Sequence, residues 1–184
     1  MHGSLFHGLK RYVLARDGQA AWDAIVAAAG AHGWYFATQR YDDAELSALL
    51  NATARSQDRE LQDVLEDYGA SLVPPLLDLY GAFVNPTWRT VDLLLNVETV
   101  IHKTVRLRDP SADPPRLRVR LVDDHSVEIV YTSERRLCAV AMGICRGVAE
   151  HYGERLTLEH PECMLRGDPT CRVLARVEPN GVDT

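Results

Sequence analysis

The sequence predicts an α+β fold in which an N-terminal helical part precedes a C-terminal part that combines helices with a four-stranded antiparallel sheet. Up to about residue 108, apolar residues recur at three- and four-residue spacing, which is the period of an amphipathic helix. After Pro114 and Pro115 the pattern changes to short alternating segments that are typical of strands. These two patterns define the fold class.

The first half predicts a series of short helices. Two amphipathic helices are expected before Gly30 and Gly33, on the apolar residues Leu5, Leu9, Tyr12 and Val13, then Trp22, Ile25, Val26 and Ala29. A third helix is expected from about Asp42 to Thr53 and a fourth from about Glu60 to Tyr68, each with acidic residues near its start, where the helix dipole favours them.

A longer helix is predicted from about Thr90 to Arg106, and Pro110 follows its end. Before it, Pro74 and Pro75 either open a helix or break one. The apolar stripe of the long helix comprises Leu94, Val97, Ile101 and Val105.

The second half predicts a hairpin and then a helix. Leu117 to Val122 and Val127 to Ser133 form the two strands, joined by a turn at residues 123–125. A helix is expected from Glu134 to His151, ended by Gly153 in a left-handed conformation.

Two more strands are expected at about Leu156 to His160 and Arg172 to Val177. We expect residues 1–177 to form one domain, with a helical part of about residues 1–60 and an α/β part of about residues 61–177. Residues 178–184 are expected to be a disordered tail.

The composition disfavours two classes of partner. The formal net charge of -6 argues against a nucleic-acid surface, which depends on lysine and arginine. No apolar run approaches the roughly 18 residues that a membrane helix needs, and the N-terminus lacks the pattern of a signal peptide. We therefore expect a cytoplasmic protein that binds neither nucleic acid nor membrane.

The four cysteines all lie in the last quarter of the chain, and in a reducing compartment such clustering favours metal ligation over disulfides. Cys138, His160, Cys163 and Cys171 offer a tetrahedral zinc ion four soft ligands. Cys145 is expected to be a small core residue, although it could replace Cys138 as a ligand. The alternative is a set of free buried cysteines beside a surface histidine.

The segment from Tyr131 to Arg135 brings three hydrogen-bond donors together at the end of a strand. Alternation puts Tyr131 and Ser133 on one face, and Arg135 is expected to enter the next helix. Two hydroxyls and a guanidinium suit a ligand that carries carboxylates. The alternative is a strand end with a helix-capping serine and a surface arginine.

His102 lies on the long helix, at the border of its apolar stripe and near Glu98. A lone helical histidine is usually structural, but neutral imidazole is a common ligand of iron. Its second ring nitrogen would then need an acceptor, which the sequence does not identify.

Together these features resemble the heme nitric oxide/oxygen-binding domain family, which includes bacterial gas sensors and the heme domain of soluble guanylate cyclase. The resemblance spans nearly the whole chain. It rests on Met1-His2-Gly3 before a helix, the Glu98 to His102 segment, the Ala112 to Leu117 stretch with its two prolines, and above all Tyr131-x-Ser133-x-Arg135. It implies one heme b between the helical part and the α/β part.

The resemblance also implies a role for each site residue. His102 would be the proximal ligand of a five-coordinate ferrous heme, and Tyr131, Ser133 and Arg135 would hold the propionates. Pro115, which the spacing from His102 favours over Pro114, would press on the porphyrin and distort it.

Gas selectivity would depend on the distal side of the heme. Family members that hold oxygen use a distal tyrosine, and the matching residue here is Val140. Leu5, Leu9 and Ile144 are further candidates for this wall, as is Leu72, and none of them can donate a hydrogen bond. We therefore expect nitric oxide and carbon monoxide to bind without a stable oxygen complex, unless a tyrosine such as Tyr12 or Tyr80 enters the pocket.

The resemblance implies a sensor and no enzyme. Weakening of the bond to His102 would change the conformation and signal to a separate protein, a histidine kinase or a cyclic-di-nucleotide enzyme. Some family members carry a cysteine and histidine zinc site near the C-terminus, so the alternative function is a redox sensor at the cysteine/histidine zinc site. Pairs such as Asp42 with Asp43 offer no defensible nucleophile and base.

Overall fold

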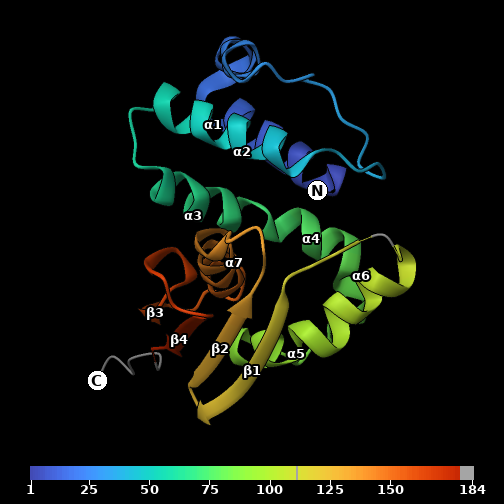
Figure 1. Ribbon diagram of the computed structural model, residues 1–184. Coiled ribbons are helices and arrows are strands. Elements are labelled where there is room, and N and C mark those ends of the chain that lie inside the picture. The colour runs from blue at the N-terminus through green and yellow to red at the C-terminus, as the bar shows by residue number, and fades with distance from the viewer. Residues whose placement is uncertain (111, 179–184) are drawn as a thin grey trace.

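The computed structural model describes residues 1–110 and 112–178 and confirms the α+β fold, with helices stacked above a four-stranded sheet (Figure 1). The helices are α1 (Gly3–Ala29), α2 (Asp43–Ser56), α3 (Leu61–Ser71), α4 (Val73–Tyr80), α5 (Thr90–Asn96), α6 (Lys103–Arg108) and α7 (Cys138–His151). The short helical segments are η1 (Gly81–Phe83), η2 (Val97–His102) and η3 (Met164–Arg166). The strands are β1 (Arg116–Asp123), β2 (Ser126–Thr132), β3 (Leu156–Glu162) and β4 (Cys171–Val177).

The two N-terminal helices predicted from the sequence are the two arms of α1. Gly18 has φ 82° and ψ -179° inside α1, a conformation that glycine adopts readily, and it kinks the helix. The second arm ends at Gly30 in the left-handed region. The next helix, α2, begins after Asp42, whose carboxylate accepts a hydrogen bond of 2.9 Å from the Ala44 N–H.

The predicted helix from Thr90 to Arg106 is not one regular α-helix. It consists of α5, a π-helical segment at Val97–His102 and α6. The wider turn of the π segment inserts an extra residue, which periodicity at 3.6 residues per turn does not reveal. The two prolines of α4 lie in its first turn, where they open the helix.

The sheet has the order β1-β2-β4-β3, and all neighbouring pairs are antiparallel. At the tip of the first hairpin, the Asp123 carboxylate accepts a hydrogen bond of 2.9 Å from the His125 N–H. One face of the sheet is covered by α7 and α5, and the buried residues of this layer are Leu94, Val127, Ile129, Met142, Cys145, Val173 and Ala175.

The helix predicted from Glu134 begins four residues later, at Cys138. Residues 133–136 form a turn in which the Arg136 N–H donates to the Ser133 carbonyl at 3.1 Å. Arg136 has a positive φ of 50°, which interrupts helical geometry before Cys138. Consequently Arg135 lies in a loop before α7, and Ser133 does not cap this helix.

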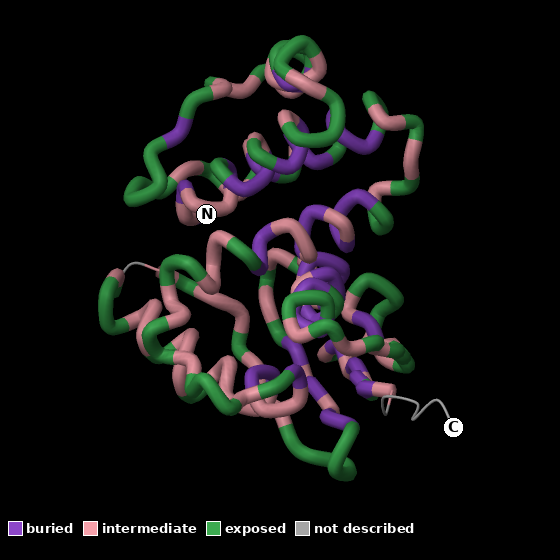
Figure 2. The backbone as a smooth tube through the Cα atoms, turned by 180° about the vertical axis from the view of Figure 1, so that it is seen from behind, coloured by how far each residue is buried: buried purple, intermediate pink, exposed green. Residues whose placement is uncertain are grey.

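The largest apolar cluster joins α1, α2 and α3 to the start of α7, and buried residues line the junction between the two halves of the molecule (Figure 2). Val64 and Tyr68 of α3 belong to this cluster, although the sequence assigned them to the α/β part. The predicted boundary near residue 60, between a helical and an α/β part, therefore stays a prediction. The predicted tail beyond Glu178 lies outside the described residues. Within those residues, no helix has the length and apolar character required to cross a membrane.

Glycines allow α3 and α7 to pack with their backbones in close contact. A methyl group on Gly143 would overlap the Glu66 carbonyl, and one on Gly69 would overlap the Val140 carbonyl. A methyl group on Gly147 would crowd the backbone of Ala70. Larger residues at these positions would separate the helices.

We expect Gly143→Ala to lower the free energy of unfolding by about 2 kcal/mol or more, because backbone atoms of α3 must move to admit the methyl group. Urea denaturation would measure the change. Gly81→Ala is the matched control, since a methyl group there meets no other atom within 4 Å and φ is -58°. Equal stability of the two variants would show that the close helix contact is not needed.

Candidate functional site

A cavity of about 640 Å³ lies where the N-terminal end of α2 meets the segment before β1 and the turn after β2. Pro114, Pro115, Ser133 and Arg135 all line it. Its other lining residues are Met1, Asp43, Ala44, Leu46, Ser47, Leu50, Asp113, Arg116, Thr132, Glu134 and Leu137. Two predicted site residues, Ser133 and Arg135, therefore share one cavity with both candidate prolines.

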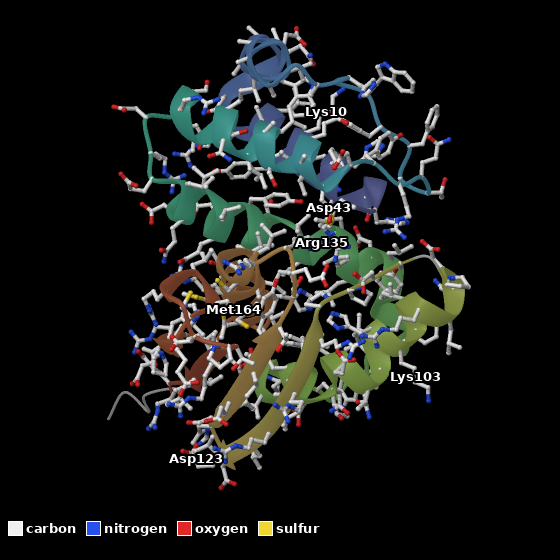
Figure 3. The ribbon with its side chains drawn as sticks, in the orientation of Figure 1. Lys10, Asp43, Lys103, Asp123, Arg135 and Met164 are labelled. Carbon is white, nitrogen blue, oxygen red and sulfur yellow. The ribbon has the colours of Figure 1, made fainter. Side chains whose placement is uncertain are left out.

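Arg135 is held between two carboxylates and is not a free surface arginine. Its Nε donates to Asp43 Oδ2 at 2.7 Å, and its Nη1 donates to Asp113 Oδ2 at 3.1 Å and to the Asp113 carbonyl at 2.8 Å. Figure 3 shows Arg135 and Asp43 meeting where the upper helices approach the rest of the molecule. The guanidinium thus already binds carboxylates in this arrangement.

Asp43 also accepts a hydrogen bond of 2.5 Å from the N-terminal ammonium of Met1. Burial opposes ionisation of Asp43, but the ammonium and Arg135 outweigh it and hold the pKa of Asp43 below its usual value. The ion pair therefore joins α2 to the strand end that bears Ser133.

Ser133 lines the cavity, whereas Tyr131 does not. Tyr131 is buried and packs against three cysteines, Cys138, Cys163 and Cys171. Ser133 lines the cavity, and its hydroxyl accepts a hydrogen bond of 3.3 Å from the Arg135 N–H. Burial raises the pKa of Tyr131, although hydrogen bonds with the Ser133 side chain and the Leu137 backbone act in the opposite direction.

His102 ends the π segment and does not line this cavity. Its Nδ1 lies 2.8 Å from Glu98 Oε2, and its side chain is 14% exposed. Burial lowers the pKa of His102, against the opposing effect of Glu98 and of a hydrogen bond to the Pro115 backbone, so the ring is predominantly neutral near pH 7.

Glu98 is the acceptor that the sequence did not identify. Besides His102, its carboxylate accepts a hydrogen bond of 3.3 Å from the Leu117 N–H and pairs with Arg106 at 2.9 Å. It therefore connects the histidine to β1 and α6. The four-residue spacing between Glu98 and His102 was the available signal.

The predicted distal residues Leu5, Leu9, Val140 and Ile144 belong to one apolar cluster, which also contains Leu72. Ile144 extends into a second cluster with Ile101, the neighbour of His102. The apolar wall and the histidine segment are therefore in contact through Ile144.

Two tyrosines border this wall. The Tyr68 hydroxyl, which the sequence reasoning missed, donates to the Leu5 carbonyl at 2.8 Å. The Tyr12 hydroxyl lies 3.3 Å from Gln57 Oε1 and accepts from Arg59 at 3.3 Å. Both hydroxyls are thus engaged by other groups.

Cys138, His160, Cys163 and Cys171 form a second site, and their potential ligand atoms all lie within 4.8 Å of one another. The Nε2 of His160 is buried without a hydrogen-bond partner among the described residues. Cys145 is not part of this group and packs under the sheet, where burial raises its pKa to about 12.

The three clustered thiols differ in their environment, because burial raises the pKa of Cys138 to about 12 and also raises that of Cys171. The Met164 N–H donates to Cys171 Sγ at 3.2 Å. Burial opposes ionisation of Cys163, but hydrogen bonds from the Leu165 backbone and the neighbouring thiols lower its pKa overall. Three thiols beside a half-buried imidazole, whose Nε2 lacks a hydrogen-bond partner among the described residues, are a donor set that fits zinc.

The sequence profile of the haem-NO-binding family matches residues 2–160. No curated protein gives a significant match.

Several solved structures are similar to this chain. One is an H-NOX protein from S. oneidensis in the Fe(II)NO state, with a TM-score of 0.90 and 24% identity, covering 97% of this chain and 100% of that chain. Another is an H-NOX domain from Shewanella oneidensis in the Fe(II)CO state, with a TM-score of 0.88, 24% identity and coverage of 98% and 100%. An unliganded Fe(II) H-NOX protein from K. algicida has a TM-score of 0.88, 20% identity and full coverage of both chains.

We expect Asp43→Asn to lower the free energy of unfolding at pH 7 by about 0.5–1 kcal/mol, a small value because the Asp43 side chain is 44% exposed. Since the folded-state pKa of Asp43 is lowered, its stabilisation is present above the unfolded pKa of about 3.9 and is lost as pH falls through the folded value. The difference between wild type and variant should therefore shrink below about pH 4.

Chemical denaturation across the pH range would measure this dependence. Asp124→Asn, at an exposed hairpin turn, is the control and should show no comparable loss. A deficit of Asp43→Asn that stayed constant down to pH 2 would contradict an ionic role.

Proposed function

This chain belongs to the haem-NO-binding family, and we propose on that premise that it binds one heme b through His102 and senses nitric oxide. The observation that carries the proposal is the pairing of the His102 imidazole, whose side chain is 14% exposed, with Glu98. With its Nδ1 proton directed to Glu98, His102 would present the lone pair of Nε2 to iron. The bound heme would supply an iron centre that takes up a diatomic gas.

The cavity beside Arg135 suits the propionates. Its guanidinium already donates to the carboxylates of Asp43 and Asp113, so the same N–H groups could donate to a ligand carboxylate in their place. Ser133 lines the same space, whereas Tyr131 packs behind it against the cysteines. Pro115, which lines the cavity and whose backbone contacts His102, is the proposed contact with the porphyrin.

The apolar wall supports a preference for nitric oxide and carbon monoxide over oxygen. Bound oxygen is stabilised by a hydrogen-bond donor, which Leu5, Leu9, Val140 and Ile144 cannot supply. Tyr68 and Tyr12 are engaged elsewhere, as described above. We therefore propose that the protein forms no stable complex with oxygen.

The signal would pass through the contacts of Glu98. In our proposal, His102 would hold the heme iron, and a displacement of its imidazole would reach β1 and α6 through the carboxylate of Glu98. A separate protein would read this change, provided that it contacts the two conformations differently. We propose a histidine kinase or a cyclic-di-nucleotide enzyme as that partner, and no catalytic activity in this chain.

The cysteine cluster supports bound zinc, and with it an alternative function as a redox sensor. Four ligands from protein would close a structural site, and oxidation of the thiolates would open it. The described cysteines are all free thiols, which supports the proposed location in the reducing cytoplasm.

We expect His102→Gly to lose the proximal bond, because glycine offers no ligand atom. The visible spectrum of the reduced, heme-loaded variant should differ from wild type and should return towards it when imidazole is added. His125→Gly, at the exposed hairpin turn, should keep the wild-type spectrum. A wild-type spectrum for His102→Gly without imidazole would reject the assignment.

We expect wild-type protein to contain about one zinc ion per chain and Cys163→Ser to lose most of it, because a serine hydroxyl is a poor substitute for a thiolate. Elemental analysis after purification without chelator would measure the metal. Cys145→Ser should retain zinc, since Cys145 lies outside the cluster. Equal zinc in both variants, or none in wild type, would count against this site.

A further inference from the structure

The carboxylate of Glu98 has three partners, which are divided between its two oxygens. Oε2 lies 2.8 Å from Nδ1 of His102 and accepts a hydrogen bond of 3.3 Å from the Leu117 N–H. Oε1 lies 2.9 Å from Nη2 of Arg106. The imidazole and the guanidinium therefore bind different oxygens of one carboxylate, and they compete for its negative charge.

The placement of Arg106 follows from its spacing along the chain. Glu98, His102 and Arg106 succeed one another at four-residue intervals through η2 and α6, and side chains at this spacing lie on one side of a helix. From the last turn of α6, the guanidinium of Arg106 reaches back to Glu98. The Leu117 N–H of β1 holds the same carboxylate independently, so Glu98 would keep its place without Arg106.

The two contacts have opposite effects on the imidazole. A carboxylate that accepts the Nδ1 proton of a histidine increases the basicity of the ring, so that Nε2 becomes a stronger metal ligand. A cation on the same carboxylate draws negative charge away from that hydrogen bond. The side chains of Arg106 and Glu98 are 38% and 26% exposed, and salt screens a partly buried pair of this kind less than a fully exposed one.

We propose that Arg106 is a positioning residue that moderates the bond between His102 and the heme iron by partly neutralising Glu98. This role rests on the proposed function, in which Nε2 of His102 binds iron, and it adds a residue that sets how readily this bond yields. Arg106 acts through Glu98 and needs no contact with heme or gas. With Glu98 alone, His102 would hold the iron more tightly and would be harder to displace.

Lys103 provides a closely matched control. It directly follows His102 and carries the same charge as Arg106, but it is exposed and forms no ion pair within the described part of the chain. Figure 3 shows Lys103 on the outer side of the molecule. Lys103→Gln therefore removes a neighbouring positive charge and leaves the partners of Glu98 unchanged. Arg106→Gln removes the charge from the carboxylate itself, and Arg106→Lys keeps a cation there.

The test is the iron–histidine stretching frequency in resonance Raman spectra of the reduced, heme-loaded, full-length protein without gas. Arg106→Gln should raise this frequency, because Glu98 then attracts the Nδ1 proton more strongly. Glu98→Gln should lower it, since a neutral amide is a weaker acceptor than a carboxylate. Arg106→Lys should fall between wild type and Arg106→Gln, and Lys103→Gln should match wild type.

The opposite signs of the two main variants separate this role from a structural one, which would shift Arg106→Gln and Glu98→Gln in the same direction. The midpoint potential of the iron gives a second readout. It should fall further in Arg106→Gln than in Lys103→Gln, because a more basic His102 favours ferric iron.

A lowered or unchanged frequency in Arg106→Gln would overturn the proposal, as would equal shifts in Arg106→Gln and Lys103→Gln. These outcomes leave heme binding by His102 intact. Failure of the wild-type protein to take up heme, or a wild-type spectrum for His102→Gly, would instead reject the proposed function, and this role with it.

Discussion

The close approach of α3 and α7 is the constraint on which both candidate sites depend. Glycines at 69, 143 and 147 let the two backbones meet, as no larger residue could. From this contact α7 presents Val140 and Ile144 to the apolar wall. Its first residue, Cys138, belongs to the cluster of thiols. The packing of a single helix pair therefore sets the geometry of the apolar wall and of the cysteine cluster together.

Charge placement then determines what the cavity can hold. The chain carries a net charge of -6, yet the cavity is lined by two arginines and the Met1 ammonium together with three acids. Asp43 and Asp113 give Arg135 carboxylate partners, which a propionate would have to share or displace. On the opposite side Glu98 fixes the orientation of His102 and ties it to β1 and α6. Carboxylates thus position both the cation and the imidazole.

Periodicity was sufficient to predict the fold class, the hairpin and the strand order along the chain, because alternation and turn residues are local signals. It failed where geometry was irregular. The π segment at Val97–His102 and the positive φ of Arg136 both lie within stretches whose apolar pattern reads as a regular helix. His102 ends the first of these irregular stretches, and Arg135 directly precedes the second.

The candidate residues could be predicted where residue type or short spacing identified them, but not where distant residues meet. Cys138, His160, Cys163 and Cys171 could be grouped from residue type alone, and the structure brings them together. Asp43 could not be linked to Arg135 from sequence, because 92 residues separate them. Long-range ion pairs of this kind leave no periodic signal, whereas Glu98 and His102 did carry one in their four-residue spacing.

The most direct test of the central claim is the visible absorption spectrum of anaerobically reduced, heme-loaded protein before and after nitric oxide, and separately after air. The account predicts a five-coordinate ferrous spectrum that shifts with nitric oxide and forms no stable complex with oxygen. A stable oxygen complex would contradict the apolar distal wall, and a failure to take up heme would contradict the role of His102.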